Sequence, residues 1–321
     1  MKAIVIREFG APEVLRLEEA ADLQPNKNQI LVKVKAAGVN PVDTYIRAGN
    51  HATAPPPPFT PGKDGAGIVE TVGANVSKVK AGDRVYLANS VTGTYAEFAL
   101  CEENQVYNLP ANVSFEQGAG VAVPYATSFW GLFDKGKPES GEIVLIHGAS
   151  GGVGIAAIQH AKHFGLKIIG TASSEQGGNL IKEQGADFVF DHAAPNYLDE
   201  IMFATGGKGA NIILEMLANV NLQNDLNIVA VKGRIVVIGN RGEITINPRL
   251  VMSKDATIRG FSLHTLTGAE TDSIHAALYE GLAGGWLNPI VGKTFPLAEA
   301  AQAHRAVIEE KAFGKIVLLM E

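Results

Sequence analysis

The pattern of apolar and polar positions changes character between the first part of the chain and the part that follows it. Up to about residue 109, apolar residues alternate with polar ones in short runs such as Ile30–Lys35, Gly67–Val72 and Arg84–Leu87. This alternation predicts half-buried β-strands. Glycine and proline residues lie between the runs, where they are typical of turns. We therefore expect a compact, mostly β domain here.

A different pattern follows a helical stretch at residues 114–133. Short apolar runs alternate with segments of helix length, and the runs are nearly continuous in their apolar character, as in parallel strands covered on both faces. This order predicts an α/β fold with a doubly wound parallel sheet of six strands, the Rossmann arrangement. The predicted strands are Ile143–Ile146, Lys167–Gly170, Phe188–Phe190, Ile212–Leu214, Arg234–Ile238 and Thr257–Gly260.

The chain beyond about His264 mixes a long helical pattern with strand-like runs at Val291–Phe295 and Lys315–Leu319. These strands could extend the parallel sheet or return to the first domain and complete it. The second arrangement makes the parallel-sheet domain an insertion. It divides the chain into one domain of residues 1–124 and 264–321 and a second domain of residues 125–263.

Composition narrows the classes of protein. With 321 residues, 46% of them hydrophobic, the chain can bury a large core and is long enough for two domains. Its formal charge of −6 is scattered, so nucleic acid is not the expected partner. A single cysteine, Cys101, excludes an intrachain disulfide and fits the reducing cytosol. No apolar run approaches the roughly 20 residues that span a bilayer, so we expect a soluble cytoplasmic protein without a membrane partner.

The sequence HGASGGVG at residues 147–154 is the strongest candidate for a ligand site. The G-x-G-x-x-G spacing of dinucleotide-binding turns falls on Ala149, Gly151 and Gly154. Glycine turns also join strands to helices without any ligand. Here, however, the turn follows an apolar strand and opens a helix within a repeated strand–helix pattern. This setting favours a pyrophosphate bound at the helix N-terminus.

The residues after the second predicted strand indicate which dinucleotide binds. NAD-specific sites place an Asp or Glu at the end of that strand, whereas this chain has Thr171–Ser174. Ser173 and Gln176 have the spacing of a capping box, which puts Glu175 in the first turn of the next helix. NADPH is therefore favoured over NADH, although no Lys or Arg lies in this stretch.

Five segments spread over nearly the whole chain carry a resemblance to a known family: residues 37–47, 82–85, 147–154, 215–221 and 246–249. They resemble the zinc-free quinone oxidoreductases of the medium-chain dehydrogenase/reductase superfamily, and most closely the zeta-crystallin branch. The resemblance implies a GroES-like, β-rich catalytic domain built from both chain ends, a Rossmann domain between them, and NADPH-dependent reduction of quinones.

The resemblance also predicts that no zinc is bound. Zinc-containing members have a cysteine where this chain has Asn40, and a Gly-His-Glu where it has Gly62, Lys63 and Asp64. These replacements remove zinc ligands. Without a metal, catalysis depends on positioning and on hydrogen bonds to the developing oxyanion.

Matching positions in the family give the expected site residues. The catalytic candidates are Tyr45, Asn40 and Asp43. Tyr45 is the candidate for orienting the substrate or donating a proton, and Asn40 and Asp43, in the same loop, are candidates for orienting the substrate; all three also have ordinary structural uses. Lys311 could supply the cation for the 2′-phosphate. The expected cofactor-binding residues are Tyr45, Ser150, Gly151, Gly152, Val153, Ser173, His192, Asn221, Ile238, Gly239, Asn240, Arg241, Phe261, Ser262 and Leu263.

Other functions and partners stay open at this point. Reduction of an activated C=C bond in enones or enoyl thioesters is one alternative to quinone reduction. A crystallin-like or RNA-binding role is another, although the charge does not support RNA. We expect a homodimer or homotetramer, because residues 243–247, with alternating Ile244 and Ile246, could form an edge strand that pairs two copies across a two-fold axis. His160 and His163 are expected to be exposed to solvent.

Overall fold

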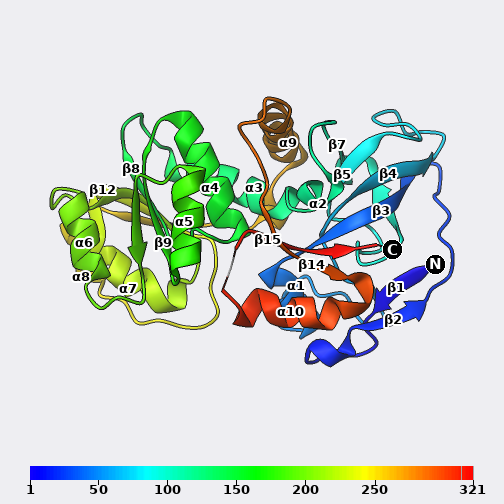
Figure 1. The fold of residues 1–321 in the computed structure, drawn as a ribbon, viewed down its shortest axis with the longest axis horizontal. Coiled ribbons are helices and arrows are strands. Elements are labelled where there is room, and N and C mark those ends of the chain that lie inside the picture. The colour runs from blue at the N-terminus through cyan, green and yellow to red at the C-terminus, as the bar shows by residue number, and fades with distance from the viewer. Residues whose placement is uncertain (312, 321) are drawn as a thin grey trace. The chain divides into compact units, whose positions relative to one another are not determined.

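The computed structural model describes residues 1–311 and 313–320, which fold into two compact units (Figure 1). Unit 1 contains residues 1–123 and 275–310 and the last residues from Gly314. Unit 2 contains residues 124–274 together with Lys311 and Phe313. The second change of unit falls inside a helix, whereas the sequence pattern places this boundary at residue 264.

Unit 1 is built on a seven-stranded sheet in which segments from both ends of the sequence are neighbours. The C-terminal strand β15 (Lys315–Leu319) runs antiparallel to β3 (Gln29–Val39), with Leu318 opposite Ala37. The tail of the chain therefore returns to the first domain (Figure 1). The other strands are β14 (Val291–Pro296), β4 (Asp64–Val72), β5 (Arg84–Ala88), β6 (Phe98–Glu102) and β7 (Val106–Asn108), and β1 (Lys2–Val5) and β2 (Arg16–Glu19) form a separate pair.

Strand β3 divides the core of unit 1 because successive side chains point to opposite faces. Ala37 and Val39 pack with α10 (Ala300–Glu309), whereas Ile30 and Val32 pack with residues of the neighbouring strands on the other side. The remaining α-helices that begin or lie in this unit are α1 (Pro41–Arg47), α2 (Phe115–Gly118), α3 (Ala122–Phe129) and α9 (Gly268–Ala283), of which α3 and α9 continue across the unit boundaries.

Unit 2 contains the predicted parallel sheet, with all six strands in the order β10-β9-β8-β11-β12-β13. This is the strand order of the doubly wound dinucleotide-binding fold. The strands lie where the apolar runs predict them, and four extend further at one or both ends. Their bounds are β8 (Ile143–Ile146), β9 (Lys167–Ala172), β10 (Phe188–Asp191), β11 (Ala210–Glu215), β12 (Val229–Val237) and β13 (Thr257–Gly260).

Helices cover both faces of this sheet. Val144 and Ile146 of β8 pack with α4 (Gly152–Phe164) and α5 (Glu175–Gln184) on one face. Leu145 belongs to the core on the other face, under α6 (Tyr197–Ala204), α7 (Ala218–Ile228) and α8 (Pro248–Ser253). Helices therefore shield both faces of the sheet from solvent, which explains why its strands are continuous apolar runs.

Two local predictions are wrong. Residues 243–247 form no strand, since Asn247 instead caps the N-terminus of α8 and accepts a hydrogen bond from the Arg249 N–H at 3.0 Å. His160 is only 1% exposed. It lies among Tyr125, Phe129 and Phe133, because the buried stripe of α4 runs through His160; His163 is exposed, as expected.

Helix length gives one further result. None of the helices within residues 1–311 and 313–320 is both long enough and apolar enough to cross a membrane.

Candidate active site

The glycine turn joins β8 to α4 with the geometry of a phosphate-binding turn. Gly148 has φ +56°, so the left-handed conformation of the tight turn falls on this residue and not on Ala149. At Gly154, a Cβ would lie 2.5 Å from the Ala149 Cα, so only glycine allows the helix this close to the turn. Helix α4 begins at Gly152, and its first N–H groups have no partner within the helix. Alanine is tolerated at position 149, where the motif has its first glycine, because Gly148 takes the left-handed conformation instead.

The turn lies at the point where the sheet changes direction of winding. Strands β8 and β11 are neighbours in the sheet, and the connections leaving them go to opposite sides. Ligands of such sheets bind at this switch point, beyond the carboxyl ends of the strands. The predicted cofactor residues of unit 2 all follow the carboxyl end of one of the strands: residues 150–153 after β8, Ser173 after β9, His192 after β10, Asn221 after β11, residues 238–241 after β12 and residues 261–263 after β13.

Ser173 and His192 lie at the end of neighbouring strands. The His192 N–H donates to the Ala172 carbonyl at 3.2 Å, next to Ser173. Ser174 caps α5 by accepting a hydrogen bond from the Gly177 N–H at 3.2 Å. The capping residue is therefore Ser174 and not Ser173 as predicted, whereas Glu175 does lie in the first turn of the helix.

Lys311 brings a cation to the same place. Its Nζ donates to the Ser173 carbonyl at 2.9 Å, and its side chain is exposed. The stretch Thr171–Ser174 has no Lys or Arg of its own, and the ammonium group nearest to Ser173 in this contact comes from a residue far along the chain.

The loops after β11 and β12 are tied together by backbone hydrogen bonds. The Ile238 N–H donates to the Glu215 carbonyl at 2.8 Å, and the Ala218 N–H donates to the Gly239 carbonyl at 2.9 Å. A Cβ on Gly239 would lie 2.2 Å from the Met216 carbonyl oxygen, so glycine is needed for this approach. The Arg241 N–H donates to Asn219 Oδ1 at 2.9 Å. These bonds fix the segments that contain Asn221 and Arg241.

In unit 1, Tyr45, Asn40 and Asp43 lie on or beside helix α1, where the sequence predicts a loop. Pro41 begins the helix, and the Asn40 N–H donates to Asp43 Oδ2 at 2.9 Å. Asn40 and Asp43 are buried, at 3% and 1% exposure, whereas Tyr45 is half-buried. The two buried residues therefore support the helix, and Tyr45 is the most accessible of the three.

A chain of buried hydrogen bonds connects two residues of α1, Arg47 and Asp43, through His304 and Tyr95. The Arg47 guanidinium lies 3.3 Å from His304 Nδ1, so Nδ1 accepts and the proton of the imidazole is on Nε2. His304 Nε2 lies 3.2 Å from the Tyr95 hydroxyl, which donates to Asp43 Oδ2 at 3.4 Å. Burial lowers the pKa of His304 to about 3, so this imidazole is neutral at pH 7.

The pKa of Asp43 moves in the opposite direction. Burial raises it to about 6, the Asn40 N–H opposes the rise, and the nearby Asp64 adds to it. Asp43 consequently gains a proton under mildly acidic conditions, and α1 loses a charged partner there.

The residues at the expected zinc positions form a different site. Lys315 Nζ donates to Asp64 Oδ2 at 2.8 Å and to Asn40 Oδ1 at 2.5 Å, and Asn40 Nδ2 donates to Asp64 Oδ2 at 3.0 Å. Asp64 is fully buried, and its other oxygen accepts from the Val123 N–H at 2.9 Å. An ammonium group thus already neutralises the carboxylate that a metal would need, so these residues do not fit zinc.

Sequence reasoning missed one polar cluster in unit 2. His147 Nε2 lies 2.8 Å from Asp225 Oδ1 and 3.6 Å from Glu215 Oε2, and all three side chains are buried. One nitrogen or oxygen atom from each of the three side chains lies within 4.8 Å of the other two. A histidine and two carboxylates at such distances also occur in metal sites. The distance of 2.8 Å is that of a direct hydrogen bond. The residues are far apart in sequence, so only the fold brings them together.

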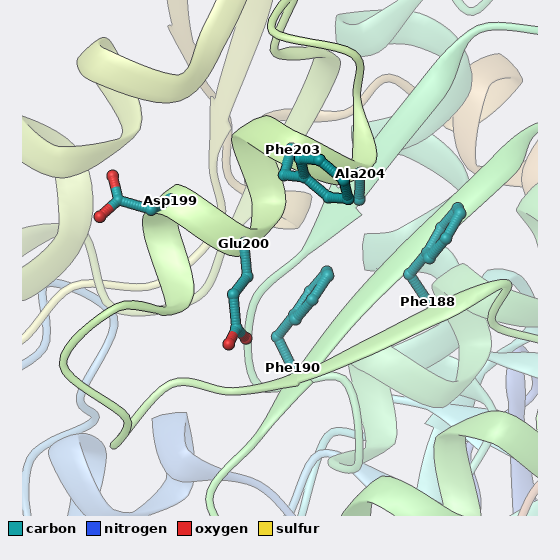
Figure 2. Close-up of a pocket in the computed structure, with 6 residues that line it drawn as sticks. All are labelled: Phe188, Phe190, Asp199, Glu200, Phe203 and Ala204. Atoms are coloured by element: carbon teal, nitrogen blue, oxygen red, sulfur yellow. The ribbon is translucent and has the colours of Figure 1, made fainter.

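A separate apolar pocket lies between β10 and α6. Figure 2 shows the six residues that line it: Phe188, Phe190, Asp199, Glu200, Phe203 and Ala204. The first two belong to β10 and the other four to α6. None of the predicted site residues lines it.

The two units together define the class of protein: a β-rich unit built from both chain ends and a doubly wound unit with a glycine turn at its switch point. Residues 26–111 match the alcohol dehydrogenase GroES-like domain, and residues 152–278 match the zinc-binding dehydrogenase domain. The chain belongs to the quinone oxidoreductases of the medium-chain dehydrogenase/reductase superfamily and is an oxidoreductase.

Individual relatives support this assignment. A quinone oxidoreductase of Sus scrofa is 49% identical over 322 residues, covering 100% of this chain and 98% of that one. The structure of Escherichia coli quinone oxidoreductase complexed with NADPH has a TM-score of 0.91 and 31% identity, covering 99% and 100% of the two chains. An NAD-dependent alcohol dehydrogenase has a TM-score of 0.93 and 30% identity, covering 100% of both chains.

Proposed function

We propose that this chain is an NADPH-dependent quinone reductase that uses no zinc. One observation carries the choice of cofactor. The end of β9 has Ser173 with the Lys311 ammonium 2.9 Å from its carbonyl, and no carboxylate in the stretch Thr171–Ser174. A 2′-phosphate is stabilised by a cation and repelled by a carboxylate. The NADPH complex of the Escherichia coli relative agrees with this choice.

NADPH, when bound, supplies the reducing equivalents. The residues of the chain bind and orient the reactants. The N–H groups at the start of α4 would hold the pyrophosphate, and Ser173, His192 and Lys311 would hold the 2′-phosphate. The Tyr45 hydroxyl donates a hydrogen bond to the quinone oxygen on which charge develops. Asn40 and Asp43 act through α1, which they hold in place.

The test is NADPH oxidation by the purified protein against ortho-quinones, para-quinones and enones. We expect turnover with quinones and little with enones. Preferential turnover of enones would instead establish a C=C reductase, and cofactor binding without any turnover would favour a crystallin-like role. Activity is expected to survive extensive chelation, and loss of activity that added zinc restores would contradict a zinc-free mechanism.

We also propose that the chain is cytoplasmic and self-associates as a homodimer or homotetramer. Strand β13 is an edge of the parallel sheet, and apolar side chains are exposed near it, including Val231 and Met252 at 68% and 80% exposure. Exposed apolar groups beside an edge strand are typical of an interface. Analytical ultracentrifugation checks this, and a monomer at micromolar concentration would contradict it.

A further inference from the structure

We propose that His147, Asp225 and Glu215 form a buried cluster that shares a proton, positions Asn221 for the cofactor and makes cofactor affinity depend on pH. The proposal rests on the function proposed above, because Asn221 is there taken to bind NADPH. His147 follows β8, Glu215 ends β11, and Asp225 and Asn221 belong to α7. The cluster therefore lies at the carboxyl ends of β8 and β11, the two strands that flank the switch point of the sheet.

The contacts connect the cluster to Asn221. Glu215 Oε1 accepts from Asn221 Nδ2 at 3.1 Å and from the Leu217 N–H. The side-chain amide of Asn221 is thus held through its nitrogen, which leaves its oxygen available as an acceptor. Asn221 is only half-buried, unlike Glu215. Glu215 is consequently a positioning residue, and Asn221 is the residue that reaches the ligand.

The cluster contains two buried carboxyl groups and no Lys or Arg. Glu215 and Asp225 are both fully buried. Within the described part of the chain, no donor makes a hydrogen bond to Glu215 Oε2 or to Asp225 Oδ2. Two buried carboxylates that lack a cation cannot both remain ionised at low cost. A proton held by the two carboxyl groups lowers this cost, and the cluster is compact enough to share one, because one ligand-type atom of each of its three residues lies within 4.8 Å of the others.

The direction of the pKa shifts agrees with this geometry. Burial raises the pKa of Glu215 to about 7; His147 opposes the rise and Asp225 adds to it. Burial likewise raises the pKa of Asp225 to about 7. Burial lowers the pKa of His147, so the neutral imidazole donates its Nε2 proton to Asp225. The carboxyl pair thus titrates as a unit.

Two further titratable groups interact with the cluster from elements packed against it. Tyr197 of α6 has its pKa raised by burial, then by Asp225 and Glu215. His192, after β10, has its pKa lowered by burial, then by His147. Above neutral pH the pair loses its shared proton and carries a second negative charge. That charge weakens the binding of an anionic cofactor and alters the hydrogen bond between Glu215 and Asn221.

The experiment measures NADPH dissociation constants by fluorescence at several pH values from about 6.5 to 8.5. We expect affinity of the wild type to fall roughly tenfold over this range, corresponding to coupling of about one pKa unit. Glu215→Gln keeps the acceptor for Asn221 but cannot ionise. This variant is expected to bind like the wild type at the lower pH and not to weaken at the higher pH. Asp225→Asn is the second variant with the same expected loss of pH dependence.

Asp199→Asn is the matched control, because it removes an exposed carboxylate of α6 in the same unit. The 2′-phosphate titrates near pH 6 in every variant, so the difference between variants is the measurement. A wild-type pH profile retained in both Glu215→Gln and Asp225→Asn overturns the proposal, as does a stoichiometric metal ion that depends on Glu215. If the wild type binds no NADPH at any pH, the proposed function itself fails.

Discussion

Lys311 is the single side chain on which we expect the choice of cofactor to depend. Replacing it by Gln removes the ammonium beside Ser173 while keeping a similar length. NADPH affinity is expected to fall roughly tenfold, or about 1.4 kcal/mol, a modest value because the side chain is exposed. NADH affinity should stay unchanged. Lys208→Gln, at another exposed lysine of unit 2, is the control, and an equal loss for both cofactors would show a structural effect.

The Tyr45 hydroxyl is the second residue whose role can be isolated. Tyr45→Phe keeps the ring on α1 and removes only the donor. If that donor stabilises charge on the quinone oxygen, steady-state turnover falls at least about tenfold while the NADPH dissociation constant changes less than about twofold. Tyr279→Phe, at an exposed tyrosine of α9, is the control. Unchanged turnover in Tyr45→Phe would dismiss a chemical role for the hydroxyl.

At the scale of elements, the approach of α4 to β8 depends on Gly154. Alanine there places a Cβ 2.5 Å from the Ala149 Cα, so the helix must move away from the turn. Gly154→Ala is expected to weaken NADPH binding more than about tenfold, measured by fluorescence titration. Ala149→Gly is the matched variant. It restores the complete glycine motif without a clash, and its affinity should stay close to that of the wild type.

The elements differ in how well their sequence predicts them. The six strands of unit 2 were predictable because buried parallel strands are short, continuous apolar runs. Helix α1 was not, since its seven residues are too few to show a helical period, and only the cap by Asn40 and Pro41 reveals it. Residues 243–247 alternate like a strand, but the Asn247 cap of α8 decides their conformation.

The site was predictable in part for a similar physical reason. The glycine turn follows a local pattern that backbone geometry imposes, whereas Ser173 was placed in the site only by resemblance to the family, and the local pattern that made it a helix cap was one residue off. The Lys315–Asp64–Asn40 group and the His147–Asp225–Glu215 cluster depend on contacts between distant segments. No local pattern marks these residues, and a buried Lys or Glu looks in sequence like an exposed one.

For the molecule as a whole, His275 connects α9 to the sheet of unit 1. Its Nδ1 lies 2.8 Å from the Tyr86 hydroxyl, and its ring stacks on Tyr107 with centroids 3.8 Å apart. Burial lowers its pKa to about 3. In the unfolded chain the pKa of a histidine is about 6.5. Between about pH 3 and pH 6.5 the folded state therefore binds fewer protons than the unfolded state, and the free energy of unfolding decreases as the pH falls below about 6.5.

His275→Phe removes this titration. At pH 7 the variant should be destabilised by about 1 kcal/mol through loss of the hydrogen bond to Tyr86. Below about pH 6.5 the difference from the wild type should shrink by up to about 1.4 kcal/mol per pH unit. Urea unfolding at several pH values measures this, with His264→Phe as the control at an exposed histidine. A difference that is constant with pH would show that the pKa of His275 is the same in the folded and unfolded states.

The pairing of β15 with β3 also governs the order in which the chain can fold during translation. Residues 36–39 of β3 find their partners in residues 316–319, which leave the ribosome after the residues of unit 2. Unit 2, apart from Lys311 and Phe313, is synthesised well before them. One edge of β3 therefore stays open at residues 36–39 on a nascent chain whose second unit is already synthesised. Such an edge is a target for wrong pairing, so chaperone dependence during synthesis should be concentrated in the N-terminal strands.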